Sequence, residues 1–206
     1  MGRREANKAE KLERILSAGL TAFREEGFAA ASVERVVADA DVARGTFYLY
    51  FPDKIALYAA LADRVFAPVE AALADARAAL AACPTIEATF PLYAALGGRL
   101  AMILAERVDE VRVVFAESRA PGPAGAVVRA GMGRIIDATE GILADAIGRG
   151  ELRPHAPRVV ALAIVGGVER LVEAALDGDP TLDVTLVPSE VTALFRRGVA
   201  PPGAAF

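Results

Sequence analysis

The sequence has 206 residues, of which 54% are hydrophobic and 24% charged, and its formal net charge is −4 at pH 7. Such a chain can bury a core, so it is not a disordered protein, and no apolar run approaches the roughly 18 residues of a membrane span. With one cysteine and one histidine it cannot form an intrachain disulfide or a thiolate zinc site, and few nucleophile–base pairs remain. We therefore expect no cofactor, no metal and no enzymatic activity, and, because the N-terminus lacks a secretory signal, a cytoplasmic protein.

The first predicted helix covers residues 8–26 and stops at Gly27, a residue that commonly ends helices. Its apolar side chains recur at the three- and four-residue spacing of one buried face. They are Leu12, Ile15, Leu16, Gly19, Leu20 and Phe23.

Two short helices and a long one are expected next. Ser32 is a good N-cap for a helix that ends near Ala40, and a three-residue turn then leads to a helix over residues 44–50. Asp53 is placed to cap a long alanine-rich helix, which Pro68 should kink.

Loops rich in proline and glycine divide the remainder into five further helices. They are expected at roughly 85–107, 109–118, 124–148, 157–177 and 186–197. Alanine, the strongest helix former, makes up about a fifth of the chain, and period-two alternation is nearly absent. The sequence therefore predicts an all-α fold.

The two short helices and their turn have the proportions of a helix-turn-helix, whose second helix enters the DNA major groove. In that helix Phe47 and Phe51 fall about 40° apart around the axis and should face the core. The outward residues are Gly45, Thr46 and Leu49, flanked by Tyr48 and Tyr50. Such a face permits close approach, hydrogen bonds to bases or phosphates, and contact with a thymine methyl.

The distribution of charge also points to this segment. Residues 1–54 carry nine Lys/Arg and nine Asp/Glu, whereas residues 55–206 carry fourteen and eighteen. All three lysines, Lys8, Lys11 and Lys54, lie in the first segment, so an anion-binding face is expected there. Ser32 and Lys54 stand at helix starts and are expected to bind phosphates.

The run VARGTFYLYFPDK at residues 42–54 is the most specific motif in the chain. Together with residues 15–20, Phe23, Gly27-Phe28 and Ser32-Val33, it resembles the TetR family of bacterial transcriptional regulators. The resemblance covers the first quarter of the chain. It implies a homodimer that binds a pseudo-palindromic double-stranded DNA operator and is released by a small-molecule effector.

Carried over residue by residue, the resemblance implies DNA contacts from Ser32, Arg44, Thr46, Tyr48, Tyr50 and Lys54. Two positions depart from the family pattern. Asp41 replaces a glycine, and Ala43 replaces a serine that caps the recognition helix, a loss worth about 1 kcal/mol. We expect DNA binding to survive both changes.

The resemblance and the helix pattern together predict two domains: residues 1–54 as the DNA-binding domain, and residues 55–206 as a helical domain for ligand binding and dimerisation. An apolar pocket for a largely hydrophobic ligand, with an anionic or hydrogen-bonding end, is expected from Phe66, Phe90, Tyr93, Met102, Phe115 and Met132. For any one of these residues, a place in a filled core is the simpler interpretation. The dimer interface is expected at Leu162, Gly166, Gly167, Val191, Leu194 and Phe195.

Two other functions remain open. One is an all-helical enzyme or small-molecule carrier without specific DNA binding, and the other is a helical scaffold that binds only protein. Salt-sensitive binding to a DNA duplex separates the regulator from both.

Overall fold

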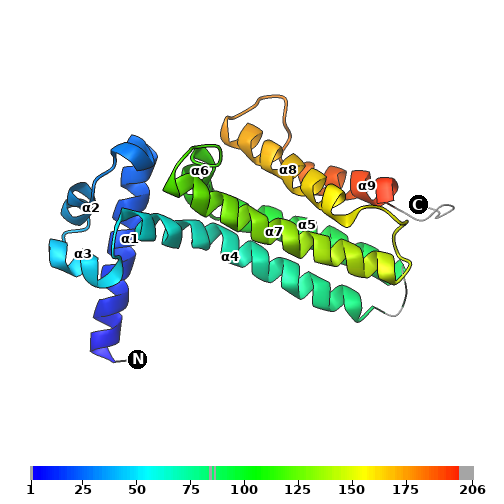
Figure 1. Ribbon diagram of the computed structural model, residues 1–206, viewed down its shortest axis with the longest axis horizontal. Helices are drawn as coiled ribbons and strands as arrows, with labels where there is room; N and C mark the ends of the chain where they lie inside the picture. Colours follow the sequence, from blue (N-terminus) through cyan, green and yellow to red (C-terminus); the bar gives the residue numbers. More distant parts are fainter. Residues whose placement is uncertain (1, 84, 86, 200–206) are drawn as a thin grey trace. The chain divides into compact units, whose positions relative to one another are not determined.

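The all-α fold is confirmed. The structure, a computed structural model, describes residues 2–83, 85 and 87–199, and no strand occurs among them. Its helices are shown in Figure 1. They are α1 (Arg3–Ala30), α2 (Val33–Asp39), α3 (Arg44–Tyr50), α4 (Lys54–Ala81), a 3₁₀ turn (Glu87–Thr89), α5 (Phe90–Ala105), α6 (Val108–Ala116), α7 (Pro123–Gly148), α8 (Pro157–Leu176) and α9 (Val187–Val199).

Three local signals in the sequence are confirmed, while several helix bounds differ from the prediction. The first helix, predicted at residues 8–26, extends over Arg3–Ala30. Gly27 has φ +77° and ψ 162°, so the regular helix of α1 is interrupted where the stop was expected. The bounds of α3 are those predicted, and the Asp53 carboxylate accepts a 2.8 Å hydrogen bond from the Ala56 amide as a cap of α4. The helix predicted from residue 85 begins only at Phe90, after the 3₁₀ turn.

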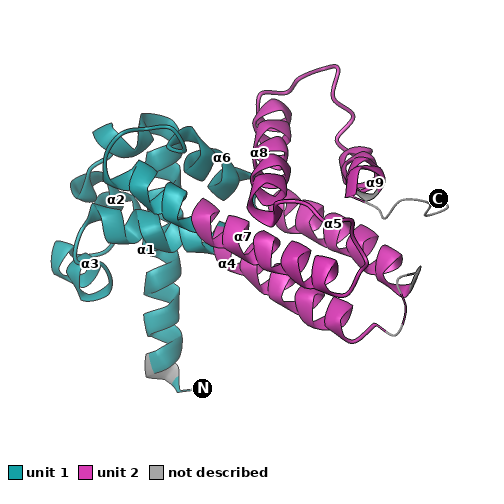
Figure 2. Cartoon of the chain, turned by 45° about the vertical axis from the view of Figure 1, so that its right-hand side comes forward, with its two compact units in different colours: residues 1–65, 107–131 teal, residues 66–106, 132–206 magenta. Residues whose placement is uncertain are grey.

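The chain divides into two compact units (Figure 2). Unit 1 comprises residues 1–65 and 107–131, and unit 2 comprises residues 66–106 and 132–206. Helices α4 and α7 contribute to both. The boundary predicted at residue 54, between the two expected functions, does not coincide with these units and stays a prediction.

Unit 1 is built around the apolar face of α1. Ile15, Leu16 and Phe23 on this face are buried, as the periodicity predicts. The backbone of α1 comes so close to α4 at Gly19 that a Cβ there would lie 2.6 Å from Cδ2 of Leu57. Helix α6 also packs on α1, and the two are joined by an ion pair between Arg24 and Asp109 of 3.1 Å.

Unit 2 is a bundle in which the distal part of α4 packs with α5 and α7. Its buried residues are Val69, Leu73, Leu80 and Ile142, with partly buried side chains of α5 and α7 around them. Helix α9 lies on α5, and Arg158 of α8 pairs with Asp137 and Glu140 of α7. No helix in the described part of the chain is long and apolar enough to cross a membrane.

Two glycines allow a matched test of the backbone. Gly27 has a conformation that essentially only glycine adopts, whereas Gly45 lies in a helix, and a Cβ at either position would contact nothing within 4 Å. We expect Gly27→Ala to lower the free energy of unfolding by about 1–3 kcal/mol through backbone strain alone. Gly45→Ala should raise it by about 0.5 kcal/mol because alanine favours the helix. Urea unfolding followed by circular dichroism measures both, and equal effects would contradict the assigned conformations.

Candidate DNA-binding site

The helix-turn-helix begins with a side-chain cap. The Ser32 hydroxyl oxygen accepts a 3.1 Å hydrogen bond from the Arg35 amide, so the predicted N-cap of α2 is confirmed. This bond satisfies one of the amides that the first turn of a helix leaves without a partner. The start of α2 is thereby fixed at the end of α1.

The turn between α2 and α3 depends on Asp41, one of the two departures from the family pattern. Asp41 has φ +49°, a left-handed conformation that glycine adopts freely and aspartate tolerates better than most residues. An amino group of Arg14 donates to the Asp41 carbonyl at 2.8 Å and to its carboxylate at 2.9 Å. The negative charge introduced near the DNA-binding surface is thus paired by an arginine of α1.

The second departure leaves α3 without a side-chain cap. Ala43 occupies the N-cap position, and only its carbonyl contributes, accepting from the amides of Thr46 at 2.8 Å and Phe47 at 3.3 Å. Helix α3 is therefore stabilised by its packing rather than by a side-chain cap at its first turn.

That packing divides α3 into two faces. Phe47 is fully buried and Phe51 is 6% exposed, so both anchor the helix as expected. On the other side Leu49 is 83% exposed and Tyr48 44% exposed, while a Cβ on Gly45 would meet open space. Large apolar side chains that are exposed to solvent beside polar ones indicate an interaction surface. Such a surface can contact the edge of a DNA base, which offers both hydrogen-bonding groups and, on thymine, a methyl group.

Arg44 stands at the start of this exposed face. Its guanidinium pairs with Glu34 at 2.8 Å and donates to the Tyr48 hydroxyl at 3.4 Å. The hydrogen bond to Tyr48 and then the charge of Glu34 raise the pKa of Arg44, so it remains a cation. Since both partners are exposed side chains, the arginine can exchange them for a phosphate at little cost.

Tyr50 and Lys54 have partners inside the protein. The Tyr50 hydroxyl donates to the Lys8 carbonyl at 3.0 Å, which ties the end of α3 to α1. The Lys54 ammonium donates to the carbonyls of Phe28, Ala29 and Ala31 at 2.6, 3.1 and 2.7 Å. The phosphate contacts expected of both residues would have to replace these bonds.

Sequence reasoning missed the role of Arg35. Its guanidinium donates to the carboxylates of Asp39, Glu25 and Glu26, which joins α2 to the end of α1 and raises the pKa of the arginine. The i, i+4 spacing of Arg35 and Asp39 predicts their ion pair from the sequence. The ion pairs of Arg35 with α1 could not be predicted in this way, because they depend on the angle between the two helices.

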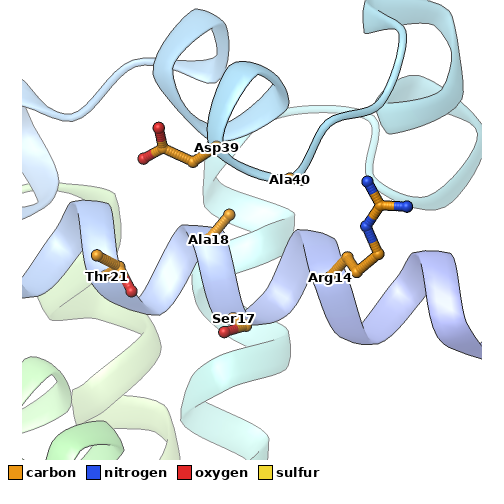
Figure 3. A pocket seen from close by; sticks show the side chains of 6 residues that line it. All are labelled: Arg14, Ser17, Ala18, Thr21, Asp39 and Ala40. Carbon is orange, nitrogen blue, oxygen red and sulfur yellow. The ribbon is translucent and has the colours of Figure 1, made fainter.

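A hollow of about 430 Å³ opens beside the turn that follows α2 (Figure 3). It lies between α1 and the end of α2. The lining residues are Arg14, Ser17, Ala18, Thr21, Asp39 and Ala40. Because its most polar lining side chains already pair across the turn or with Arg35, the hollow carries no ligand assignment.

The residues predicted to line a ligand pocket are only partly brought together. Phe66 is buried in unit 2, where Phe90, Tyr93 and Met132 are half-buried. Phe115 belongs to unit 1. Met102 is 61% exposed, so within the described chain it faces away from the bundle core.

The residues predicted at the dimer interface lie largely on the surface. On α8, Leu162 is 49% exposed, and Gly166 and Gly167 are also exposed. On α9, Leu194 is 73% exposed. Val191 and Phe195 are half-buried.

Residues 15–61 match the family model described as "Bacterial regulatory proteins, tetR family". Over these residues the chain is similar to the TetR family. The uncharacterized HTH-type transcriptional regulator YvdT of Bacillus subtilis (strain 168) is 44% identical over 55 residues, which are 27% of this chain and 28% of that protein. The matched part thus spans about a quarter of that relative.

Solved structures extend the likeness of the fold to most of the chain. A TetR-family protein from Syntrophomonas wolfei matches with a TM-score of 0.78 at 14% identity, over 91% of this chain and 94% of that one. SmeT, the repressor of the Stenotrophomonas maltophilia multidrug efflux pump SmeDEF, matches with 0.76 at 21% identity, over 95% and 93% of the two chains. Its triclosan complex matches with 0.77 at 20% identity, over 95% and 94%. FadR of Bacillus subtilis in complex with stearoyl-CoA matches with 0.70 at 20% identity, over 88% and 96%.

Proposed function

We propose that the protein is a transcriptional repressor that binds a pseudo-palindromic DNA operator as a homodimer and is released by a small, largely apolar ligand. The observation that carries the DNA-binding part is the two-faced α3. Phe47 and Phe51 hold it from one side, while Gly45, Tyr48 and Leu49 stand exposed on the other. Packing in the core explains the two phenylalanines, but it does not explain why a leucine and a tyrosine are exposed on the same helix.

In the proposed complex, α3 enters the major groove. Gly45 allows the backbone to approach, Thr46 and Tyr48 supply hydroxyl groups, and Leu49 meets a thymine methyl. Ser32, Arg44 and Tyr50 bind phosphates on either side. Two-fold symmetry would place two such helices about one turn of DNA apart, which produces a pseudo-palindrome.

The DNA-binding proposal is tested with a duplex that the protein itself selects from a random-sequence pool. Thr46→Val and Tyr48→Phe each remove one hydroxyl at nearly constant shape, and a lost hydrogen bond of about 1 kcal/mol should weaken binding roughly fivefold. Leu49→Ala should relax the preference for thymine at one position of each half-site. Leu186→Ala is the matched control, because this leucine is 52% exposed outside α3. Unchanged affinity and sequence preference in all three α3 variants would remove this helix from the interface, as measured by fluorescence anisotropy.

The exposed faces of α8 and α9 support the homodimer. On α8, Val159 is 64% exposed and Leu162 49% exposed, and Gly166 follows one turn later. On α9, Leu194 is 73% exposed. Two such helices from each chain would form a four-helix contact in which the small residues let backbones approach.

The glycine at the centre of that face provides the test of the dimer. A Cβ on Gly166 would meet nothing within 4 Å, so within one chain there is room for a larger side chain. We expect Gly166→Leu to shift the protein from dimer to monomer in light scattering. The monomer should remain folded, because the new side chain has room within its own chain. Gly148→Leu, at another exposed helical glycine with open space, is the control and should remain dimeric. A dimeric Gly166→Leu protein would place the interface elsewhere.

The ligand site is proposed in unit 2, around α5. This helix is strongly apolar, yet none of its residues is fully buried. The buried hydroxyl of Tyr93 has no hydrogen-bond partner among the residues that the structure describes, although Tyr93 packs against the core of the unit. A buried donor without a partner costs about 1–3 kcal/mol, which a ligand group could recover.

The charges around Tyr93 favour a neutral ligand group. Burial and then the Glu151 carboxylate raise the pKa of Tyr93 to about 12, so the phenol keeps its proton at pH 7. The nearby Arg149 is already engaged by Glu151 through bonds of 2.5 and 3.1 Å. The ligand is therefore an apolar molecule with one hydrogen-bonding group, and release from DNA requires it to bind the DNA-incompetent conformation more tightly.

Triclosan and stearoyl-CoA, the ligands of two structurally similar proteins, are the probes for this site. We expect the phenol triclosan to bind more tightly than the polyanionic stearoyl-CoA and to lower the affinity for the selected duplex. Tyr93→Phe should weaken triclosan binding about five- to tenfold in calorimetry, because one hydrogen bond is lost. Met102→Ala, at an exposed position, should leave it unchanged. If a probe binds but leaves DNA affinity unaltered, release by ligand is wrong while DNA binding stands.

An all-helical ligand carrier or enzyme without specific DNA binding is the alternative. It predicts that the random-sequence selection enriches no duplex and that any DNA affinity is independent of α3.

A further inference from the structure

Lys54 sits where three segments of the helix-turn-helix meet. It is the first residue of α4, four residues after α3 ends, and its ammonium lies at the end of α1 just before the Ser32 cap of α2. Its half-buried side chain also places Nζ 4.6 Å from the centre of the Phe28 ring. A cation over an aromatic ring adds to the attraction that the carbonyl groups supply.

The hydrogen bonds of Lys54 are fully committed within the protein. A lysine ammonium has three N–H donors. In this structure the three acceptors are the carbonyls of Phe28, Ala29 and Ala31, at 2.6, 3.1 and 2.7 Å. These carbonyls belong to the last residues of α1 after Gly27 and to its C-cap, Ala31, and the C-terminal end of a helix carries partial negative charge. No N–H remains for a phosphate unless one of these bonds breaks.

We propose that Lys54 is a positioning residue for DNA recognition and not a phosphate contact. It joins the end of α1, and through it the start of α2, to the first turn of α4, and so fixes both ends of the segment that contains α3. This inference rests on the proposed DNA binding. It differs from the role expected from the sequence, in which the same charge reaches the DNA.

The two roles differ in their dependence on salt. A lost phosphate contact lowers the slope of log affinity against log salt by about 0.9 for each protomer, whereas a lost internal contact leaves the slope unchanged. The test compares Lys54→Met, which keeps the apolar stem, with Lys54→Arg, which keeps the charge and donors. Arg129→Met, at an exposed arginine of α7 outside the helix-turn-helix, is the charge-matched control. Binding to the selected duplex and to a scrambled duplex is measured at several salt concentrations and at a temperature where every chain is fully folded.

We expect Lys54→Met to weaken binding to the selected duplex about tenfold at every salt concentration, with the wild-type slope and a smaller preference over the scrambled duplex. Amide hydrogen exchange at residues 32–36 should become faster. Lys54→Arg should restore most of the affinity. A slope reduced by about 0.9 per protomer with unchanged exchange would make Lys54 a phosphate contact and overturn the proposal. Wild-type affinity in the folded variant would overturn it as well.

A measurement on the wild-type protein covers the case in which Lys54→Met does not fold. Reductive methylation, read by mass spectrometry, should modify Lys54 slowly both with and without the selected duplex, because its donors are engaged in both states. Protection of Lys54 that appears only with DNA would overturn the proposal. If the wild-type protein selects no duplex at all, the proposed function fails and this inference fails with it, whereas the outcomes above overturn this inference alone.

Discussion

The close approach of α1 and α4 at Gly19 is the constraint on which the DNA-binding unit depends. Leu57, which fills the space that a side chain at position 19 would need, is fully buried. Lys54 lies three residues before it on α4, and Tyr58 one residue after it, packing against Phe23 with ring centres 5.7 Å apart. One face of the first turns of α4 therefore supplies the fixed support against which α1 and the two short helices are held.

Several arginines in and around the helix-turn-helix form ion pairs with carboxylates of the same chain. Arg14 pairs with Asp41, Arg44 with Glu34, and Arg35 with carboxylates of α1 and α2. Much of the positive charge near the recognition helix is thus compensated before DNA arrives. In the proposed complex, specific contacts from short side chains would then matter more for binding than long-range attraction, unlike in a strongly basic DNA-binding domain.

Signals that act within a few residues could be predicted from the sequence. The Ser32 cap, the interruption at Gly27 and the bounds of α3 depend on local backbone chemistry, and all were predicted. The partners of Lys54 could not be predicted, because they are backbone carbonyls 23 to 26 residues earlier whose direction is set by Gly27. A side-chain motif reports which residue types recur, but it does not report where main-chain acceptors point.

The same limit applies to the candidate pocket. Beyond residue 54 the helices carry more apolar residues than one buried stripe requires, yet periodicity does not distinguish the buried Phe66 from the exposed Met102. Their difference arises from how the bundle helices are rotated against each other, which single-helix patterns do not contain.

The residues of α3 that pack in the core are different from those that would determine the preferred DNA sequence in the proposed complex. Phe47 carries the packing, whereas Leu49 and Gly45 make few contacts with the rest of the chain. Substitutions at the exposed positions therefore change the surface offered to DNA with little effect on the core. Gene duplication could give each copy its own target sequence through a few mutations in α3, while selection for a folded protein continues to act on the other face.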